Sequence, residues 1–328
     1  MNRILVVGAG LIGARHIQAV QAHPDCILAG VVDPDGKKRS ACNVPAFTDL
    51  DSVNVAVDAA IIATPTALHT DHTLMAIRNG WHCLIEKPVA NDLSGADRII
   101  TAADTAGVST LVGHHRRYHA SVIKLRNLIR KGDIGRPVVA SLIWTVRKPD
   151  DYFCTAWRTD TGGSPVMINL VHDIDLLRFL LGEVSHVSAV RAQSVRQAAR
   201  VESGVITLAF RSGATASITF SDATPSPFGF EAGTAENPHI AASHQDMLWI
   251  MGTKGAVSFP SLGLWHGAND WSHKQQCRKL SVENTHPLTA QLDHFIAVLH
   301  GQEEPLITAQ DARETLAAAL QAEAQLRP

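Results

Sequence analysis

Three glycines near the start of the chain have the spacing of a phosphate-binding turn. Gly8, Gly10 and Gly13 form a G-x-G-x-x-G pattern between an apolar run and a helical pattern, and Asp33 follows 20 positions later at the end of a second apolar run. Gly8 permits a tight turn, Gly10 lets the backbone approach a pyrophosphate, and Gly13 lets the helix pack close to the strand. A carboxylate at Asp33 can accept hydrogen bonds from the hydroxyls of an adenine ribose. The pattern therefore predicts a dinucleotide site.

Lys87 and His172 are the side chains best suited to act on an alcohol. Removal of a hydride from a secondary alcohol leaves a developing alkoxide, which needs a base of near-neutral pKa and a cationic group beside the oxygen. His172 is the candidate base because imidazole titrates closest to neutral pH. Lys87 follows a predicted strand and precedes Pro88, where we expect a cis peptide bond. The alternatives are a surface lysine and a packed helical histidine that a neighbouring aspartate satisfies.

Four further side chains are candidates for contacts with a substrate. Arg117 follows the last predicted strand of the first part, Tyr152 and Arg158 fall in a predicted loop, and Asn169 lies three positions before His172. Two separate arginine sites favour a substrate that carries a carboxylate. The alternatives are a solvated basic turn or a cofactor contact at Arg117, and a surface amide at Asn169.

Apolar runs and helical patterns alternate over the first third of the chain and would position the glycine turn, Asp33 and Lys87. The expected strands are 3–7, 26–32, 57–63, 81–85 and 108–112. Strands that alternate with helices imply a parallel, doubly wound sheet. Ligands of such sheets bind beyond the carboxyl ends of the strands. We therefore expect the segments that follow these strands to line one edge of the sheet.

The pattern changes after Tyr118, where strands follow one another with few helices between them. Strands are expected at 137–146, 184–192, 204–210, 214–221 and 247–251, and helices at 121–130, 162–181, 288–300 and 310–326. Consecutive strands favour antiparallel pairing. The predicted fold is α/β, with a nucleotide-binding domain that contains a doubly wound parallel sheet at 1–118 and a second domain with a largely antiparallel sheet at 119–328.

Several motifs together resemble the glucose–fructose oxidoreductase, inositol dehydrogenase and MocA (Gfo/Idh/MocA) family. They are the glycine turn, the sequence Ala-Thr-Pro-Thr at 63–66, Glu-Lys-Pro at 86–88, and Gly162-Gly163 followed by Asn169, His172 and Asp175. The resemblance implies an N-terminal Rossmann domain at 1–118 and a C-terminal α+β domain with an open, mostly antiparallel sheet at 119–328. It also implies a bound nicotinamide cofactor, catalytic roles for Lys87 and His172, and substrate contacts from both. Many relatives carry an aspartate four residues before this histidine, where this chain has Ile168. The expected cofactor-binding residues are Gly8, Gly10, Leu11, Ile12, Gly13, Asp33, Thr64, Pro65, His69, Glu86 and Lys87.

The overall composition excludes several other classes of protein. The net charge is −2 and hydrophobic residues make up 45%, which argue against a nucleic-acid-binding surface and against disorder. No apolar run is long enough to span a membrane. Five cysteines without a C-x-x-C pair favour a reducing compartment, and we expect a cytoplasmic location and no metal site. An open sheet with one apolar face favours a homodimer or homotetramer.

These features predict an NAD-dependent oxidoreductase that acts on a secondary hydroxyl of a sugar, cyclitol or sugar acid. NAD is expected over NADP because the Asp33 carboxylate would repel a 2′-phosphate, although Lys37, Lys38 and Arg39 soften that preference. Two other functions stay open at this point. The first is an NAD-dependent glycosidase that uses transient oxidation, and the second is a non-catalytic NAD sensor.

Overall fold

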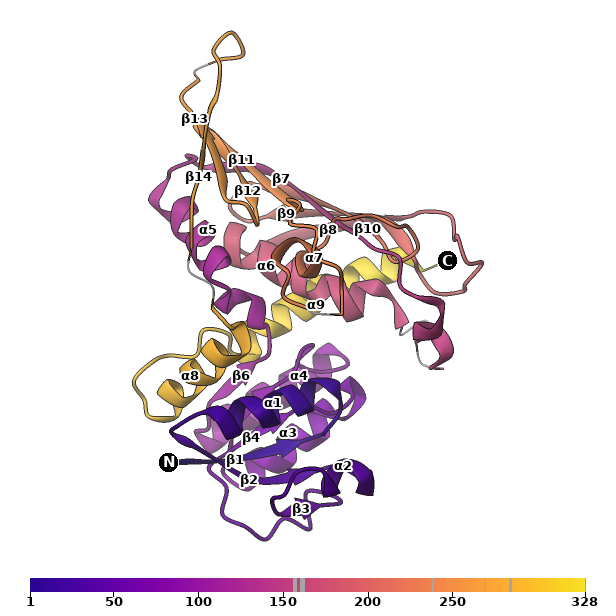
Figure 1. Cartoon of the computed structure of the whole chain (residues 1–328), viewed down its shortest axis with the longest axis vertical. Coiled ribbons are helices and arrows are strands. Elements are labelled where there is room, and N and C mark those ends of the chain that lie inside the picture. The colour runs from indigo at the N-terminus through magenta and orange to yellow at the C-terminus, as the bar shows by residue number, and fades with distance from the viewer. Residues whose placement is uncertain (156–157, 160–162, 238, 269, 283–284, 328) are drawn as a thin grey trace. The chain divides into compact units, whose positions relative to one another are not determined.

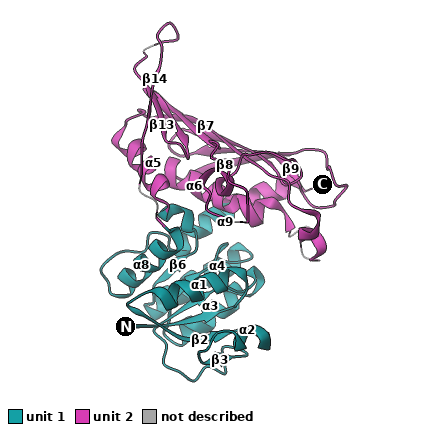
Figure 2. Ribbon diagram, viewed as in Figure 1, with its two compact units in different colours: residues 1–118, 286–317 teal, residues 119–285, 318–328 magenta. Residues whose placement is uncertain are grey.

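The computed structural model describes residues 1–155, 158–159, 163–237, 239–268, 270–282 and 285–327. Two compact units are distinguished (Figure 2): the first contains residues 1–118 and 286–317, and the second contains residues 119–285 and 318–328. Within the described ranges, no helix is both long and apolar enough to cross a membrane.

A parallel sheet forms the centre of the first unit (Figure 1). Residues 1–118 are all described, and they contribute six strands in the order β3-β2-β1-β4-β5-β6. The strands are β1 (Asn2–Val7), β2 (Cys26–Val32), β3 (Ala46–Phe47), β4 (Ala59–Ile62), β5 (His82–Ile85) and β6 (Thr110–Val112). The connecting helices are α1 (Leu11–Ala22), α2 (Gly36–Ser40), α3 (His69–Arg78) and α4 (Leu93–Ala106). The predicted doubly wound Rossmann sheet is confirmed.

Burial and capping explain why these elements form. The side chains of β1 and β4 are buried almost throughout, which requires helices on both faces of the sheet. Asp92 caps the N-terminus of helix α4, because its carboxylate accepts a hydrogen bond from the Gly95 N–H at 2.7 Å. Gly107, in the left-handed conformation, caps the C-terminus. Because every strand is parallel, the segments after β1, β2, β4 and β5 meet at one edge.

Helix α8 (Pro287–Leu299) joins the first unit although it lies far along the chain. It contacts α1 and the 3-10 helix η2 (His115–Tyr118). The rings of Tyr118 and His294 lie 5.6 Å apart, and Leu292 and Phe295 are buried. The first compact unit therefore contains residues 286–317 as well as 1–118, whereas a single boundary at residue 118 was predicted. The reason is that the apolar face of α8 packs on the N-terminal part of the chain.

The second unit contains a mixed sheet in which most strand pairs are antiparallel. Its described residues give the strand order β14-β13-β12-β11-β7-β10-β9-β8, with β7 and β10 as the parallel pair. The strands are β7 (Pro137–Thr145), β8 (Val184–Arg191), β9 (Ser203–Phe210), β10 (Thr215–Ser221), β11 (Leu248–Gly252), β12 (Gly255–Phe259), β13 (Gly263–His266) and β14 (Gln276–Lys279). The predicted open, mostly antiparallel sheet is confirmed.

One face of this second sheet is covered by helices and the other is open. Figure 1 shows α5 (Ala120–Lys131), α6 (Val171–Leu181) and the end of α9 (Ala309–Leu326) on the same side of the sheet, while α7 (Phe230–Thr234) is a short turn of helix. Residues alternate between buried and more exposed along β9 and β10, as a sheet with one covered face requires. The helix-covered face forms one continuous apolar core.

The helix that carries His172 does not begin as a regular α-helix. Residues Val166–Leu170 form a π-helix, η6, and α6 follows from Val171. The expected helix at 162–181 is therefore regular only in its second half. The three- and four-residue spacings that relate Ile168 and Asn169 to His172 assume α-helical geometry, so they do not hold across this junction.

Candidate functional site

The glycine turn after β1 has the shape that a pyrophosphate requires. Gly8 has a φ of +96°, and a Cβ atom there would lie 2.6 Å from the Ala63 carbonyl oxygen. A Cβ atom at Gly13 would lie 1.9 Å from the Gly8 carbonyl oxygen. A Cβ atom at Gly10 would meet no atom within 4 Å, so the space beside Gly10 is open. The turn is thus closely packed at two glycines and open at the third, where a phosphate would approach.

Helix α1 begins directly at this open space. Leu11 and Ile12 are its first two residues, and its first turn contains no acidic side chain. The N-terminus of a helix presents backbone N–H groups and a positive dipole end to an anion. The turn and the start of α1 together fit the pyrophosphate of a dinucleotide.

Asp33 lies at the end of β2 and is 5% exposed. Its Oδ2 accepts a hydrogen bond from the Ala9 N–H at 2.8 Å, and its Oδ1 accepts one from the Asp35 N–H at 2.9 Å. The Lys38 ammonium group lies 3.6 Å from Oδ2, and the Arg39 guanidinium donates to the Asp33 carbonyl at 2.6 Å. Asp33 therefore holds the glycine turn, and two cations flank it where a ribose would bind.

His69 connects two turns at the same edge of the sheet. One ring nitrogen lies 2.9 Å from the Thr64 carbonyl oxygen and the other lies 2.8 Å from the Pro88 carbonyl oxygen. The ring is 1% exposed, and burial lowers the pKa of His69 although both carbonyls favour the protonated ring. His69 thus fixes the turns that present Pro65, which is exposed, and Lys87. Its ring is enclosed by protein rather than presented to a cofactor.

Glu86 is a buried carboxylate directly before Lys87. Its Oε1 lies 2.8 Å from His16 Nε2, and its Oε2 accepts the Lys87 N–H at 3.2 Å. Burial opposes ionisation of Glu86, but the hydrogen bond to His16 and the charges of His16, His115 and Lys87 outweigh it and lower its pKa to about 2. The Lys87–Pro88 peptide bond is cis, as expected. An ionised carboxylate therefore accepts a hydrogen bond from the backbone N–H of Lys87.

The second unit gathers three of the candidate substrate residues around a fourth side chain, Lys148. The Lys148 ammonium group donates to Asn169 Oδ1 at 2.8 Å and lies 4.6 Å from the centre of the Tyr152 ring. The Arg158 guanidinium lies 4.1 Å from the same ring centre and donates to the Tyr152 carbonyl at 3.0 Å. His172 is 8% exposed and is the second residue of α6, three residues after Asn169.

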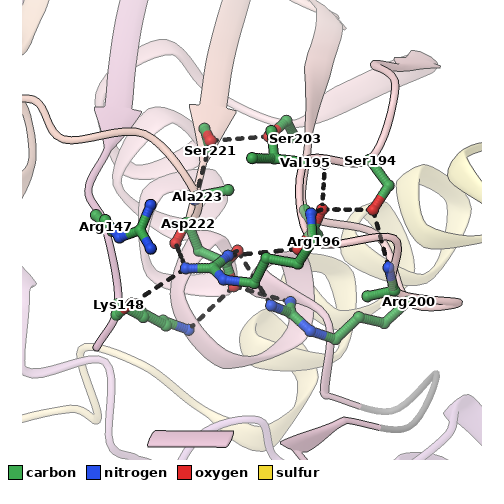
Figure 3. Close-up of polar contacts among 12 residues, drawn as sticks. Arg147, Lys148, Ser194, Val195, Arg196, Arg200, Ser203, Ser221, Asp222 and Ala223 are labelled. Carbon is green, nitrogen blue, oxygen red and sulfur yellow. Dashed lines mark hydrogen bonds and ion pairs between the residues drawn. The ribbon is translucent and has the colours of Figure 1, made fainter. Parts of the chain in front are cut away.

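Lys148 is also held by a buried network of charges (Figure 3). Its Nζ lies 3.8 Å from Asp222 Oδ2, and Asp222 is also paired with Arg196 at 3.1 Å and with Arg200 at 2.8 Å. Arg196 is further paired with Glu202 at 3.4 Å. Burial, opposed by the charge of Asp222, lowers the pKa of Lys148 to about 8.

The structure changes the set of residues that the sequence suggested for a substrate. Arg117 is 5% exposed and paired with Asp311 at 2.6 Å within the first unit, so its guanidinium is engaged by the protein. Lys148 was missed, although it begins the loop that contains Tyr152 and Arg158. Its burial depends on residues about 50 to 75 positions later, which no local pattern identifies. Gly162 of the glycine pair lies outside the described residues.

Two family models match the chain. Residues 2–114 match the model described as "Oxidoreductase family, NAD-binding Rossmann fold", and residues 122–258 match the model described as "GFO/IDH/MocA C-terminal domain". Together they account for most of both compact units.

Individual relatives are similar over different shares of the chain. The 1,5-anhydro-D-fructose reductase of Ensifer adhaerens is 36% identical over 164 residues, which cover 46% of this chain and 49% of the relative. An inositol 2-dehydrogenase of Pseudarthrobacter chlorophenolicus is 30% identical over 281 residues, which cover 81% of this chain and 78% of the relative. The chain spans only about half to two thirds of the length of the first three curated relatives that it matches.

A solved structure extends this similarity to nearly the whole chain. The WlbA dehydrogenase from Bordetella pertussis, solved in complex with NADH and UDP-GlcNAcA, superimposes with a TM-score of 0.79 at 26% identity. The match covers 99% of this chain and 96% of that protein. The open space at Gly10, the N-terminus of α1 and the Asp33 carboxylate are the features of this chain that such a dinucleotide would meet.

Proposed function

The chain belongs to the Gfo/Idh/MocA family of NAD-binding oxidoreductases, and from this premise we propose that it is an NAD-dependent dehydrogenase. Its substrate is a sugar, a cyclitol or a sugar acid, and the reaction transfers a hydride between a secondary hydroxyl carbon and the nicotinamide. The single observation that carries the proposal is the setting of Lys87, which sits at the carboxyl edge of the sheet beside an ionised, buried Glu86.

The cofactor is held by the first unit. Gly8, Gly10 and Gly13 shape the turn for the pyrophosphate, and the backbone N–H groups at the start of α1 face it. The Asp33 carboxylate accepts hydrogen bonds from the ribose hydroxyls, and it also accepts one from the Ala9 N–H, which keeps the turn in place. When bound, NAD supplies the hydride acceptor. Thr64 and Pro65 border the same edge, where His69 fixes their turn.

Lys87 acts on the oxygen of the reacting hydroxyl. As the hydride leaves, negative charge grows on that oxygen, and an ammonium group beside it stabilises the charge mainly in the transition state. The Glu86 carboxylate and the His69 contact to Pro88 hold the backbone on both sides of Lys87. The backbone that carries Lys87 is thus held in place before the substrate arrives.

His172 accepts the proton of the same hydroxyl. An imidazole is the side chain whose pKa best matches proton transfer near neutral pH. The aspartate that many relatives place four residues earlier is replaced by Ile168, and the neighbouring Asn169 is engaged by Lys148. The base therefore works without that aspartate, and Asn169 is not free to replace it because its side-chain oxygen accepts a hydrogen bond from Lys148.

The experiment that tests this function is a substrate panel followed by nicotinamide absorbance. The panel contains inositols, 1,5-anhydro-D-glucitol, aldoses, alditols and their sugar acids, each with NAD. The proposal requires net NADH formation with at least one member, and loss of that activity in Lys87→Ala with NAD affinity retained. Binding of NAD without turnover of any member would contradict it and would support an NAD sensor.

A further inference from the structure

We propose that Lys148 binds the carboxylate of an acidic substrate, so that this protein acts on a sugar acid or cyclitol acid rather than on the neutral alcohol. The inference rests on the proposed function, because it names the substrate class of the same reaction. It assigns a role in specificity to a residue at the beginning of the loop between β7 and η6.

The ammonium group of Lys148 is buried, and its hydrogen-bonding capacity is only partly used. Lys148 is 9% exposed, and an ammonium group has three N–H donors. Among the residues that the structure describes, Asn169 Oδ1 is the acceptor within hydrogen-bond distance of Nζ. Asp222 lies farther away at 3.8 Å, and the Tyr152 ring offers only its π-face. A buried ammonium group with one neutral acceptor is costly unless an anion completes its shell.

The charges around Lys148 also favour an anion. Three cations, Lys148, Arg196 and Arg200, contact two carboxylates, Asp222 and Glu202. Glu231 and Arg158 also act on Lys148, and their opposite charges cancel. Both arginines make shorter pairs with Asp222 than the lysine does. The network thus has one positive charge in excess, and Lys148 is its most weakly paired member. A monovalent carboxylate would neutralise that excess, whereas a doubly charged phosphate would exceed it.

Lys148 is held rigidly by its neighbours. Its N–H donates to the Asp222 carbonyl at 3.0 Å, and its carbonyl accepts from Arg196 at 3.1 Å. With the side chain fixed by Asn169, both the backbone and the ammonium group are held before a ligand binds. A group that is fixed in advance loses little conformational entropy on binding, which is the property expected of a recognition residue.

Lys148 is also linked to the segment that leads into the helix of the candidate base. Its partner Asn169 lies in η6, three residues before His172, which is the second residue of α6. A substrate that binds at His172 would therefore have its other substituents near the segment that holds Lys148. Sugar acids carry a carboxylate a few bonds from their secondary hydroxyls, so one such substrate would meet both residues.

The test compares matched acids and alcohols in the full-length protein. The pairs are D-glucuronate with D-glucose, D-gluconate with D-glucitol, and the substrate found in the panel with its neutral or acidic counterpart. We expect kcat/KM for the acid to exceed that for the alcohol. Lys148→Met should lower this ratio by about 10- to 100-fold, the range of a hydrogen bond to a charged group. Lys148→Arg should retain much of it.

Arg147→Met is the matched control, because Arg147 is the adjacent cation, its side chain is 51% exposed, and it pairs with the exposed Asp150 instead. Its acid-to-alcohol ratio should stay within about twofold of the original. A neutral alcohol or D-glucose 6-phosphate that is used as well as the acid would overturn the inference. So would a ratio that Lys148→Met and Arg147→Met lower equally.

Calorimetric binding of the acids to the NADH-loaded protein separates the two proposals. Binding that depends on Lys148, without any turnover, would retain the inference and reject the dehydrogenase function. Turnover of neutral substrates, without any acid binding, would reject the inference and retain the dehydrogenase function.

If Lys148→Met does not fold, the pH dependence of the unaltered protein tests the inference. The acid-to-alcohol ratio of kcat/KM should fall above about pH 8 as Lys148 loses its proton. The charged and titratable groups that face Lys148 are Asp222, Glu231, Arg200, Arg158, Arg196 and Tyr152. A ratio that stays constant between pH 6 and pH 10 would contradict the inference.

Discussion

Lys87 and His172 are proposed to serve one proton transfer, and steady-state kinetics can separate their contributions. His172→Ala should lower kcat by about 10²- to 10⁴-fold and remove the low-pH limb of the oxidation profile, because a general base is lost. Lys87→Ala should lower kcat by about 10²- to 10³-fold, because charge on the oxygen is no longer stabilised. The double variant should lose less than the product of the two single effects.

NAD affinity, measured by fluorescence titration, is the control for these variants and should stay unchanged. Full kcat in His172→Ala together with no activity in Lys87→Ala would contradict the assignment of His172 and would make Lys87, or a water next to it, the base.

We propose that the charge of Asp33 determines the choice between NAD and NADP, while its carboxylate holds the glycine turn through the Ala9 N–H. Asp33→Asn keeps an oxygen acceptor beside Ala9 but removes the charge that opposes a 2′-phosphate. With Lys38 and Arg39 already beside this position, the ratio of kcat/KM for NADP to that for NAD should rise by about 10- to 100-fold. Asp35→Asn, an exposed residue at the start of α2, is the control and should leave the ratio unchanged. A preference for NADP in the unaltered protein would reject this account of Asp33.

At the scale of elements, the pair His16–Glu86 joins α1 to the end of β5, and its contribution to stability depends on pH. The pKa of Glu86 is lowered from 4.5 to about 2, so the folded state favours its ionised form. Its contribution is complete above about pH 4.5 and is lost as the pH falls toward 2. Glu86→Gln should therefore destabilise the protein near pH 6 by a few kcal/mol, and the difference should shrink below about pH 4.5. Chemical denaturation at several pH values measures it, and a difference that grows on acidification would show that Glu86 is not the buried anion described.

Local sequence patterns predicted the strands whose side chains are buried throughout. They failed for elements whose conformation or packing depends on contacts with distant parts of the chain. The strands of the first unit are continuous apolar runs, so β1, β2, β4, β5 and β6 were expected close to their observed positions. The two-residue strand β3 has no such run and was missed. The π-helix η6 was also missed, since its sequence is as apolar as a regular helix. The packing of α8 on η2 joins residues far apart in the chain.

The same distinction applies to the candidate site. Residues at the carboxyl ends of parallel strands, such as Asp33 and Lys87, follow directly from strand order, and the sequence places them at one edge. Lys148 differs because its importance depends on Asp222 and Asn169, which other elements bring to it. The engagement of Arg117 by Asp311 likewise depends on a distant part of the chain.

At the scale of the whole molecule, the open face of the second sheet favours association of identical chains. Val139, Val190 and Val205 are exposed on β7, β8 and β9, and apolar surface of this kind on a sheet favours contact with a second copy. We propose a homodimer or homotetramer through this face. Val205→Glu should shift sedimentation toward the monomer, whereas Ile123→Glu, on the exposed side of α5, should not. A monomer in the unaltered protein at micromolar concentration would contradict the proposal.

The transfer of a hydride from substrate carbon to nicotinamide is the central claim for the molecule, and isotope transfer tests it most directly. The substrate found in the panel is prepared with deuterium on its secondary hydroxyl carbon and incubated with the protein and unlabelled NAD. Mass spectrometry of the cofactor should then show NADH that carries the deuterium. Lys87→Ala, loaded with NAD to the same extent, should form the labelled NADH about 10²- to 10³-fold more slowly. A substrate consumed without net labelled NADH, or NADH that carries no deuterium, would contradict the dehydrogenase function.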